Sequence, residues 1–160
     1  MSTILQGVQN RQLILGSLVT KAAANLPQSA TGTLFTVTGG LVIVTSLVGV
    51  VTTVIQSSDP QLSLGTAPTA GTLETSGVAT TTAITSAEVG TLVTIGSSAG
   101  LPTALVVMAA SAKAGNAVFL TGDAFVANTG TITWTTGASK TGALKWYLTY
   151  IPLDAGAYVS

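Results

Sequence analysis

The stretch Ala143-Leu-Lys-Trp-Tyr-Leu-Thr-Tyr-Ile151 decides the fold class of this chain. One set of alternate positions holds Leu144, Trp146, Leu148 and Tyr150, and the other holds Lys145, Tyr147 and Thr149. Successive side chains of a strand point to opposite faces, so this period of two is typical of an antiparallel strand buried on one face. Proline lacks the backbone N–H that a strand ladder needs, and Pro152 is expected to end the strand.

Shorter segments rich in Val, Ile and Thr precede this strand and are separated by Gly, Pro and Ser. Such segments favour strands because branched side chains pack well on a pleated surface. The predicted strands cover residues 34–38, 41–48, 50–55, 78–85, 91–95, 104–110 and 131–135. The Thr-rich segment 78–85 is expected to pair at a sheet edge.

Glycine and proline predict how these strands are connected. Gly39-Gly40 separates two strand-like runs, which predicts a β-hairpin because glycine tolerates the positive φ of tight hairpin turns. Gly49 predicts a bulge or a bend. Asp59-Pro60, Pro68 and Gly71 predict that residues 57–72 are mainly loop.

No long amphipathic helix is evident, so we predict an all-β chain. It would form a single antiparallel domain over residues 17–160, sandwich-like (of the jelly-roll kind) or barrel-like. Residues 1–16 are predicted to be an extended N-terminal arm, rich in Gln and anchored by Ile4, Leu5 and Val8. In an alternative interpretation this arm forms a short helix with Ile4, Val8 and Gln12 on one face, stable only when docked.

The charge content is low for a free globular protein. Only 6% of the 160 residues are charged, 47% are hydrophobic, and the formal net charge is zero. A weakly charged surface gives little colloidal repulsion, so we expect the chain to bury surface by self-association. The five basic residues are scattered rather than clustered, which argues against a nucleic-acid partner.

The residue types that most enzymes use are missing or dispersed. The chain has no Cys and no His, which removes thiolate chemistry and the commonest general base. Its five acidic residues lie at least 14 positions apart, so we interpret them as solvated loop residues. We therefore expect no enzymatic activity, no cofactor and no metal.

A membrane partner is not expected either. The apolar stretch Leu41–Ile55 has 15 residues, whereas a spanning helix needs about 20. The segment 13–24 resembles a signal peptide only weakly, because Lys21 interrupts it.

The aromatic residues allow two interpretations. Trp134, Trp146, Tyr147, Tyr150 and Tyr158 could form a sugar-binding platform, or they could serve core and subunit packing, which we favour. The residues predicted to lie at an assembly interface are Ile4, Leu5, Val8, Arg11, Trp134, Trp146 and Tyr150.

Two blocks resemble a family of small virion proteins from tailed bacteriophages. They are residues 21–56, KAAANLPQSATGTLFTVTGGLVIVTSLVGVVTTVIQ, and the C-terminal stretch 129–154, which ends in TGALKWYLTYIPLD. The chain departs from the family where Leu41 follows the double glycine, a position at which members often have a basic residue.

The resemblance implies a capsid decoration or cement protein. Such a protein would be a homotrimer that binds the outside of the major capsid protein lattice, after assembly in the host cytoplasm. Two alternatives stay open: another virion part, such as a tail-tube, minor tail or head-fibre base protein, and a carbohydrate-binding or adhesive module.

Overall fold

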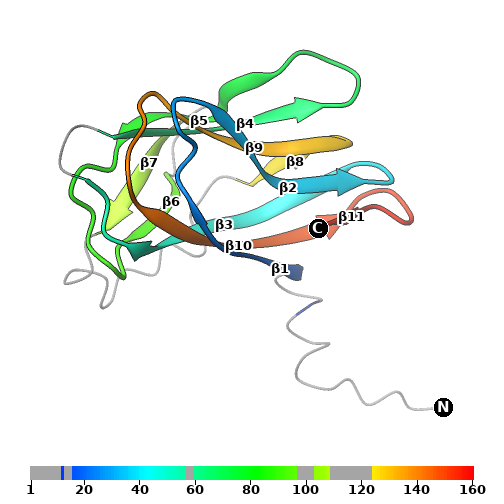
Figure 1. Cartoon of the computed structure of the whole chain (residues 1–160). Coiled ribbons are helices and arrows are strands. Elements are labelled where there is room, and N and C mark those ends of the chain that lie inside the picture. The colour runs from blue at the N-terminus through cyan, green and yellow to red at the C-terminus, as the bar shows by residue number, and fades with distance from the viewer. Residues whose placement is uncertain (1–11, 13–15, 57–59, 97–102, 109–123) are drawn as a thin grey trace, which may run out of the picture.

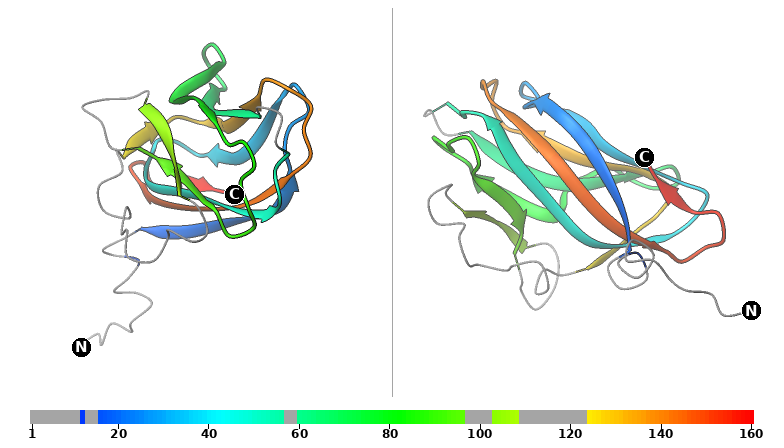
Figure 2. Two further views of the ribbon diagram at one scale, coloured as in Figure 1. Left: turned by 90° about the vertical axis from the view of Figure 1, so that its left-hand side faces the viewer. Right: turned by 90° about the horizontal axis from the view of Figure 1, so that it is seen from below.

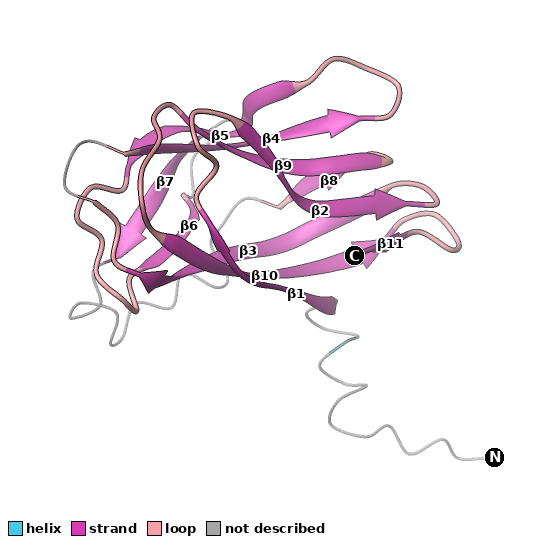
Figure 3. Cartoon of the chain, in the orientation of Figure 1, coloured by secondary structure: helices cyan, strands magenta, loops and turns pink. Residues whose placement is uncertain are grey.

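The computed structural model describes residues 12, 16–56, 60–96, 103–108 and 124–160. The regular structure in this part is almost entirely β-strand (Figure 3), which confirms the predicted all-β fold. The strands are β1 (Ser17–Asn25), β2 (Thr31–Thr38), β3 (Val42–Thr53), β4 (Gln61–Pro68), β5 (Glu74–Ala83), β6 (Leu92–Ile95), β7 (Thr103–Met108), β8 (Phe125–Ala127), β9 (Gly130–Thr136), β10 (Ala143–Pro152) and β11 (Tyr158–Val159).

The strands form one sheet that curls into a nearly closed barrel. Their order is β1-β10-β3-β6-β7-β5-β4-β9-β2-β11, and β8 also pairs with β3. Two layers face each other: sheet A contains β1, β10, β3, β8, β6 and β7, and sheet B contains β5, β4, β9, β2 and β11 (Figures 1 and 2). A short parallel pairing of β5 with β7 joins the layers, whereas the other pairings among the described strands are antiparallel.

The interior lies between the two layers, and β10 supplies much of it. Leu144, Trp146 and Leu148 are fully buried, and Tyr150 is 7% exposed. The alternate residues of β10 face outward and are half-buried, so the predicted period of two is confirmed. Burying each large apolar side chain stabilises the fold by about 1.5–3 kcal/mol, which makes this strand a main contributor to the core.

The predicted bulge does not lie at Gly49, because β3 keeps its register with β10 from Val48 to Val50. The register between β3 and β10 shifts near Thr45 and near Thr52 instead. Gly49 lies opposite Trp146, and a Cβ on Gly49 would come within 2.9 Å of ring atom Cζ3. The glycine is therefore needed because the indole ring occupies the space of a side chain.

The predicted hairpin at Gly39-Gly40 is also wrong. Both glycines have positive φ, 81° and 142°, as a tight turn requires. However, β2 pairs with β9 and β11, whereas β3 pairs with β10, β6 and β8, so the turn leads from sheet B to sheet A. Asp154, which follows β10, holds the turn by accepting a hydrogen bond from the Leu41 N–H at 2.7 Å. The glycine pair predicts a turn but not which strands pair.

Two further predictions need correction. Residues 61–68, predicted as loop, form β4, in which Leu62 and Leu64 alternate into the core. The Thr-rich β5 pairs with both β4 and β7 and is therefore an internal strand. Among the described residues, the ends of the strand order are β1 and β11.

Candidate assembly surface

The charged groups do not gather into a site in the described part of the chain. Glu74 lies on β5, Glu88 in the loop before β6, and Asp154 after β10, and all three are exposed. Asp59 and Asp123 lie outside the described residues. Within the described ranges, no group of three or more His, Cys, Asp or Glu side chains is placed to hold a metal ion. The expected lack of cofactor and of enzymatic activity stays a prediction.

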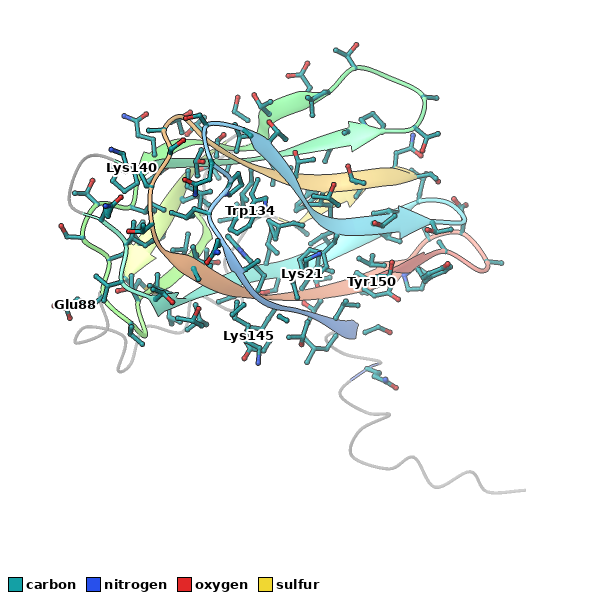
Figure 4. The ribbon with its side chains drawn as sticks, viewed as in Figure 1. Lys21, Glu88, Trp134, Lys140, Lys145 and Tyr150 are labelled. Atoms are coloured by element: carbon teal, nitrogen blue, oxygen red, sulfur yellow. The ribbon has the colours of Figure 1, made fainter. Side chains whose placement is uncertain are left out.

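The predicted interface aromatics belong to the core instead. Trp134 is 5% exposed, Trp146 is fully buried and Tyr150 is 7% exposed. Trp134 comes from sheet B (Figure 4) and Trp146 from sheet A. Their rings meet edge to face with centroids 6.1 Å apart. This geometry is favourable for an aromatic pair and ties the two layers together. These three side chains are thus occupied inside the folded chain, which corrects the prediction that they contact another subunit.

A flat aromatic platform for sugars is not formed by the remaining tyrosines. Tyr147 lies on the outer side of β10, with the Lys145 Nζ 5.0 Å from its ring centroid. Tyr158 lies on β11 in the other layer and is 49% exposed. Because the two rings are on different sheets and the tryptophans are buried, the packing interpretation of the aromatic cluster fits the structure.

The predicted arm contacts Ile4, Leu5, Val8 and Arg11 lie outside the described residues. The end of the arm is described at Gln12 and Gly16, where the Gly16 N–H donates to the Gln12 carbonyl at 3.0 Å. Gly16 has a φ of +88°, and it packs so closely on the Tyr150 carbonyl that a Cβ would overlap it. Gly16 is therefore held close to the end of β10, directly before β1.

The outer face of sheet A combines aliphatic and aromatic side chains with a few small polar ones. It is formed by the outward residues of β10 and by their register partners on the neighbouring strands: Lys145, Tyr147, Thr149 and Ile151 on β10, Leu18 and Thr20 on β1, and Ile43, Ser46, Val48 and Val50 on β3. Leu92 on β6 continues the row of Val50, and Val126 on β8 continues the row of Ile43.

Among the residues that the structure describes, this face has little charge and several of its apolar side chains are exposed. Lys145 is the one charged side chain in the set just named, and it points away from the interior (Figure 4). Leu18 is 61% exposed, Val126 57% and Ile151 38%. Val48 and Val50 at its centre are half-buried rather than buried, as expected where only neighbouring strands shield them. Apolar patches of this kind on a folded chain mark interaction sites.

The outer face of sheet B is different in character. It presents Thr31, Thr33, Thr131 and Thr135, and the hydroxyls of Thr31 and Thr135 lie 2.8 Å apart. The first residues of β5 cover part of this face, because the Glu74 carbonyl occupies the space next to Gly65 where a side chain would be. Sheet B is therefore polar or covered on its outer side, whereas sheet A is apolar and open.

A sequence signal for this surface exists in β3. Its run Val42-Ile-Val-Thr-Ser-Leu-Val-Gly-Val-Val51 is apolar at both inward and outward positions. Near-continuous apolar runs are typical of strands that are covered on both faces. Alternation in β10 identifies the inner face, but only the outward residues of β3 indicate that something packs on the outside.

No protein family, curated protein or solved structure matches this chain in the three comparisons made. No described helix has the length and apolar character that a membrane crossing would require.

Proposed function

We propose that this chain is a non-enzymatic structural protein of a bacteriophage particle, which decorates the outer surface of the head. It acts as a homotrimer on the major capsid protein lattice and stabilises that lattice. The observation that supports this proposal best is the open, weakly charged, apolar outer face of sheet A, centred on Val48 and Tyr147.

The fold is suited to such a role. The barrel is nearly closed, its two layers are tied by a tryptophan pair, and its inner face is filled by large apolar side chains. A rigid block loses little conformational entropy when it binds, and a trimer engages several lattice sites together, so modest contacts add up to strong attachment. The assignment to a phage head, and to a trimer, comes from the resemblance in residues 21–56 and 129–154.

The test is co-sedimentation of the purified protein with heads that lack it. We expect saturable binding to heads and none to isolated tails. Val48→Asp should weaken binding because it puts a carboxylate at the centre of the outer face of sheet A. The matched control, Thr33→Asp, places the same charge on an exposed position of sheet B and should bind like the parent.

Binding to isolated tails and not to heads would mean that the chain is a tail protein rather than a head decoration protein. If circular dichroism shows that both Asp variants are folded and they bind heads equally well, the outer face of sheet A does not take part in head binding. A carbohydrate-binding function is not favoured, because the tryptophans that would stack on a sugar are in the core.

A further inference from the structure

Strand β1 lies at one end of the sheet and has an open edge (Figure 1). It pairs with β10 on one side, and no other described strand pairs with it. An end strand presents a row of backbone N–H and C=O groups that a further strand can use. Six of the nine residues of β1 are exposed, so little of the described chain covers this edge. A strand from outside the barrel can therefore reach it.

The second half of β1 is protected against such pairing, but the first half is not. Proteins commonly block an edge strand with a lysine or a bulge. Lys21 is exposed, and the register with β10 shifts between Lys21 and Ala24. Residues 17–21, in contrast, pair one to one with residues 146–150 of β10, and they contain no proline and no charge before Lys21. This regular stretch is the part of the edge that can accept another strand.

The other end of the described sheet does not offer a partner edge of matching length. Strand β11 has two residues. Ser160 and Thr36 exchange both of their backbone hydrogen bonds, at 2.9 and 2.8 Å. Because residues of an antiparallel strand alternate in the direction of these groups, only Val159 of β11 directs both away from β2. One residue cannot pair with a stretch of five, so among the described strands the matching edge is β1 itself.

We propose that β1 pairs antiparallel with β1 of a second copy, about a two-fold axis at Val19. This residue is the centre of the regular stretch, so all five residues pair. Leu18 then lies opposite Thr20 of the second copy, and Ser17 lies opposite Lys21. A register centred on Lys21 would place two lysines opposite each other, which destabilises a strand pair. The pairing about Val19 is thus self-complementary, as a two-fold contact requires.

This contact goes beyond the proposed function. A two-fold contact joins copies in pairs, so it is separate from the contact that would build the homotrimer. It would link one trimer to the next, with sheet A of each copy continuing into sheet A of the other. The pairing is measured on the purified protein without heads, so its failure leaves the head-binding test untouched, and a failure of head binding leaves the pairing untouched.

Disulfide formation between two singly substituted chains tests the pairing and its register. The chain has no cysteine, so Leu18→Cys in one chain and Thr20→Cys in a second, size-tagged chain give unique thiols, both at exposed positions. Opposite Cβ atoms lie about 4.5–5.5 Å apart and diagonal ones about 7–8 Å, and a disulfide needs about 4 Å. After co-expression and mild oxidation, we expect the mixed disulfide to exceed those between like chains.

Two further cysteine variants define the results that overturn the proposal. Thr33→Cys, exposed on sheet B, is the matched control and should give at least tenfold less disulfide with Thr20→Cys. A yield with Leu18→Cys no higher than this control would mean that the edge stays open. A disulfide of Thr20→Cys with Tyr158→Cys instead would mean that β1 meets β11 of the next copy, head to tail.

A charge reversal at Ser17 gives an independent readout. Ser17 and Lys21 lie about 13 Å apart along their own strand, so a charge at position 17 acts on Lys21 mainly across the copies. Ser17→Glu should dimerise roughly tenfold more tightly than Ser17→Lys in sedimentation equilibrium at low salt, because the axis makes each contact twice. Equal dimerisation of the two variants, both folded by circular dichroism, would contradict the register.

Discussion

Gly49→Ala tests the reasoning about the core most simply. The added Cβ would lie 2.9 Å from Cζ3 and 3.0 Å from Cε3 and Cη2 of Trp146. Carbon atoms normally pack at about 3.5–4.0 Å, so the indole or the strand must move by roughly half an ångström or more. Overpacking of this kind lowers the free energy of unfolding by about 1–3 kcal/mol. Replacing glycine by alanine in a strand raises it by about 0.5–1 kcal/mol, which offsets part of the loss. The expected net loss is about 0–2.5 kcal/mol, and the midpoints of the two ranges give a loss of about 1 kcal/mol.

Thermal unfolding followed by tryptophan fluorescence measures this loss. About 1 kcal/mol shifts the melting temperature of a chain of this size by about 2–4 °C. Gly137→Ala is the control, because Gly137 lies in a loop and has no atom within 4 Å of the added Cβ. It should melt within about 2 °C of the parent. If Gly49→Ala melts as high as Gly137→Ala, the proposed contact between β3 and the indole ring is refuted.

The double variant Gly49→Ala, Trp146→Phe sharpens the result. A phenyl ring is smaller than the indole and vacates part of the space that the new methyl group needs. Residues in contact show non-additive effects on the free energy of unfolding. Gly49→Ala should therefore cost less in the Trp146→Phe background than in the parent, and equal costs would argue against direct contact.

Three further substitutions have defined outcomes. Gly16→Ala should lower the melting temperature by several degrees more than Gly156→Ala. Both glycines have positive φ (+88° and +86°), so the backbone strain is similar. At Gly16, however, the new Cβ would also overlap the backbone carbonyl of Tyr150, whereas at Gly156 it would meet no atom within 4 Å. Asp154→Ala should cost up to about 1 kcal/mol in urea unfolding, because the backbone loses a solvent-exposed hydrogen bond of 2.7 Å; no loss would mean that this bond does not hold the turn. Lys145→Met should change the free energy of unfolding by no more than about 0.5 kcal/mol. It removes the charge from the outer face of sheet A and should therefore increase association, measured as light scattering at neutral pH. Unchanged scattering would count against an open apolar face.

The sequence predicts the fold class here because local patterns agree with the global structure. In β10, alternation identifies the strand and its buried face, and Trp146 and Leu148 are core residues as that pattern requires. The same logic was available for β4, where Leu62 and Leu64 alternate. Pro60 precedes this strand and Pro68 is its last residue. Proline is typical of loops, so the segment is predicted as loop, although proline also occurs at strand ends.

The pairing of strands and the position of the assembly surface depend on distant residues. Gly39-Gly40 looks like a hairpin locally, but β2 pairs with β9 and β11 whereas β3 pairs with β10. Asp154, more than a hundred residues later, holds the turn between the two layers. Aromatic residues such as Trp134 suit cores and interfaces equally well, so sequence cannot choose between the two. The surface that is open belongs instead to aliphatic residues of β3.

Cryo-electron microscopy of the particle that contains this chain is the decisive test of whether the barrel decorates the head. We expect barrel-shaped density on the outside of the head, repeated at lattice symmetry axes, with the outer face of sheet A covered by the capsid lattice or by a neighbouring copy. Density confined to the tail, or barrels on the head whose sheet A faces solvent, would contradict it.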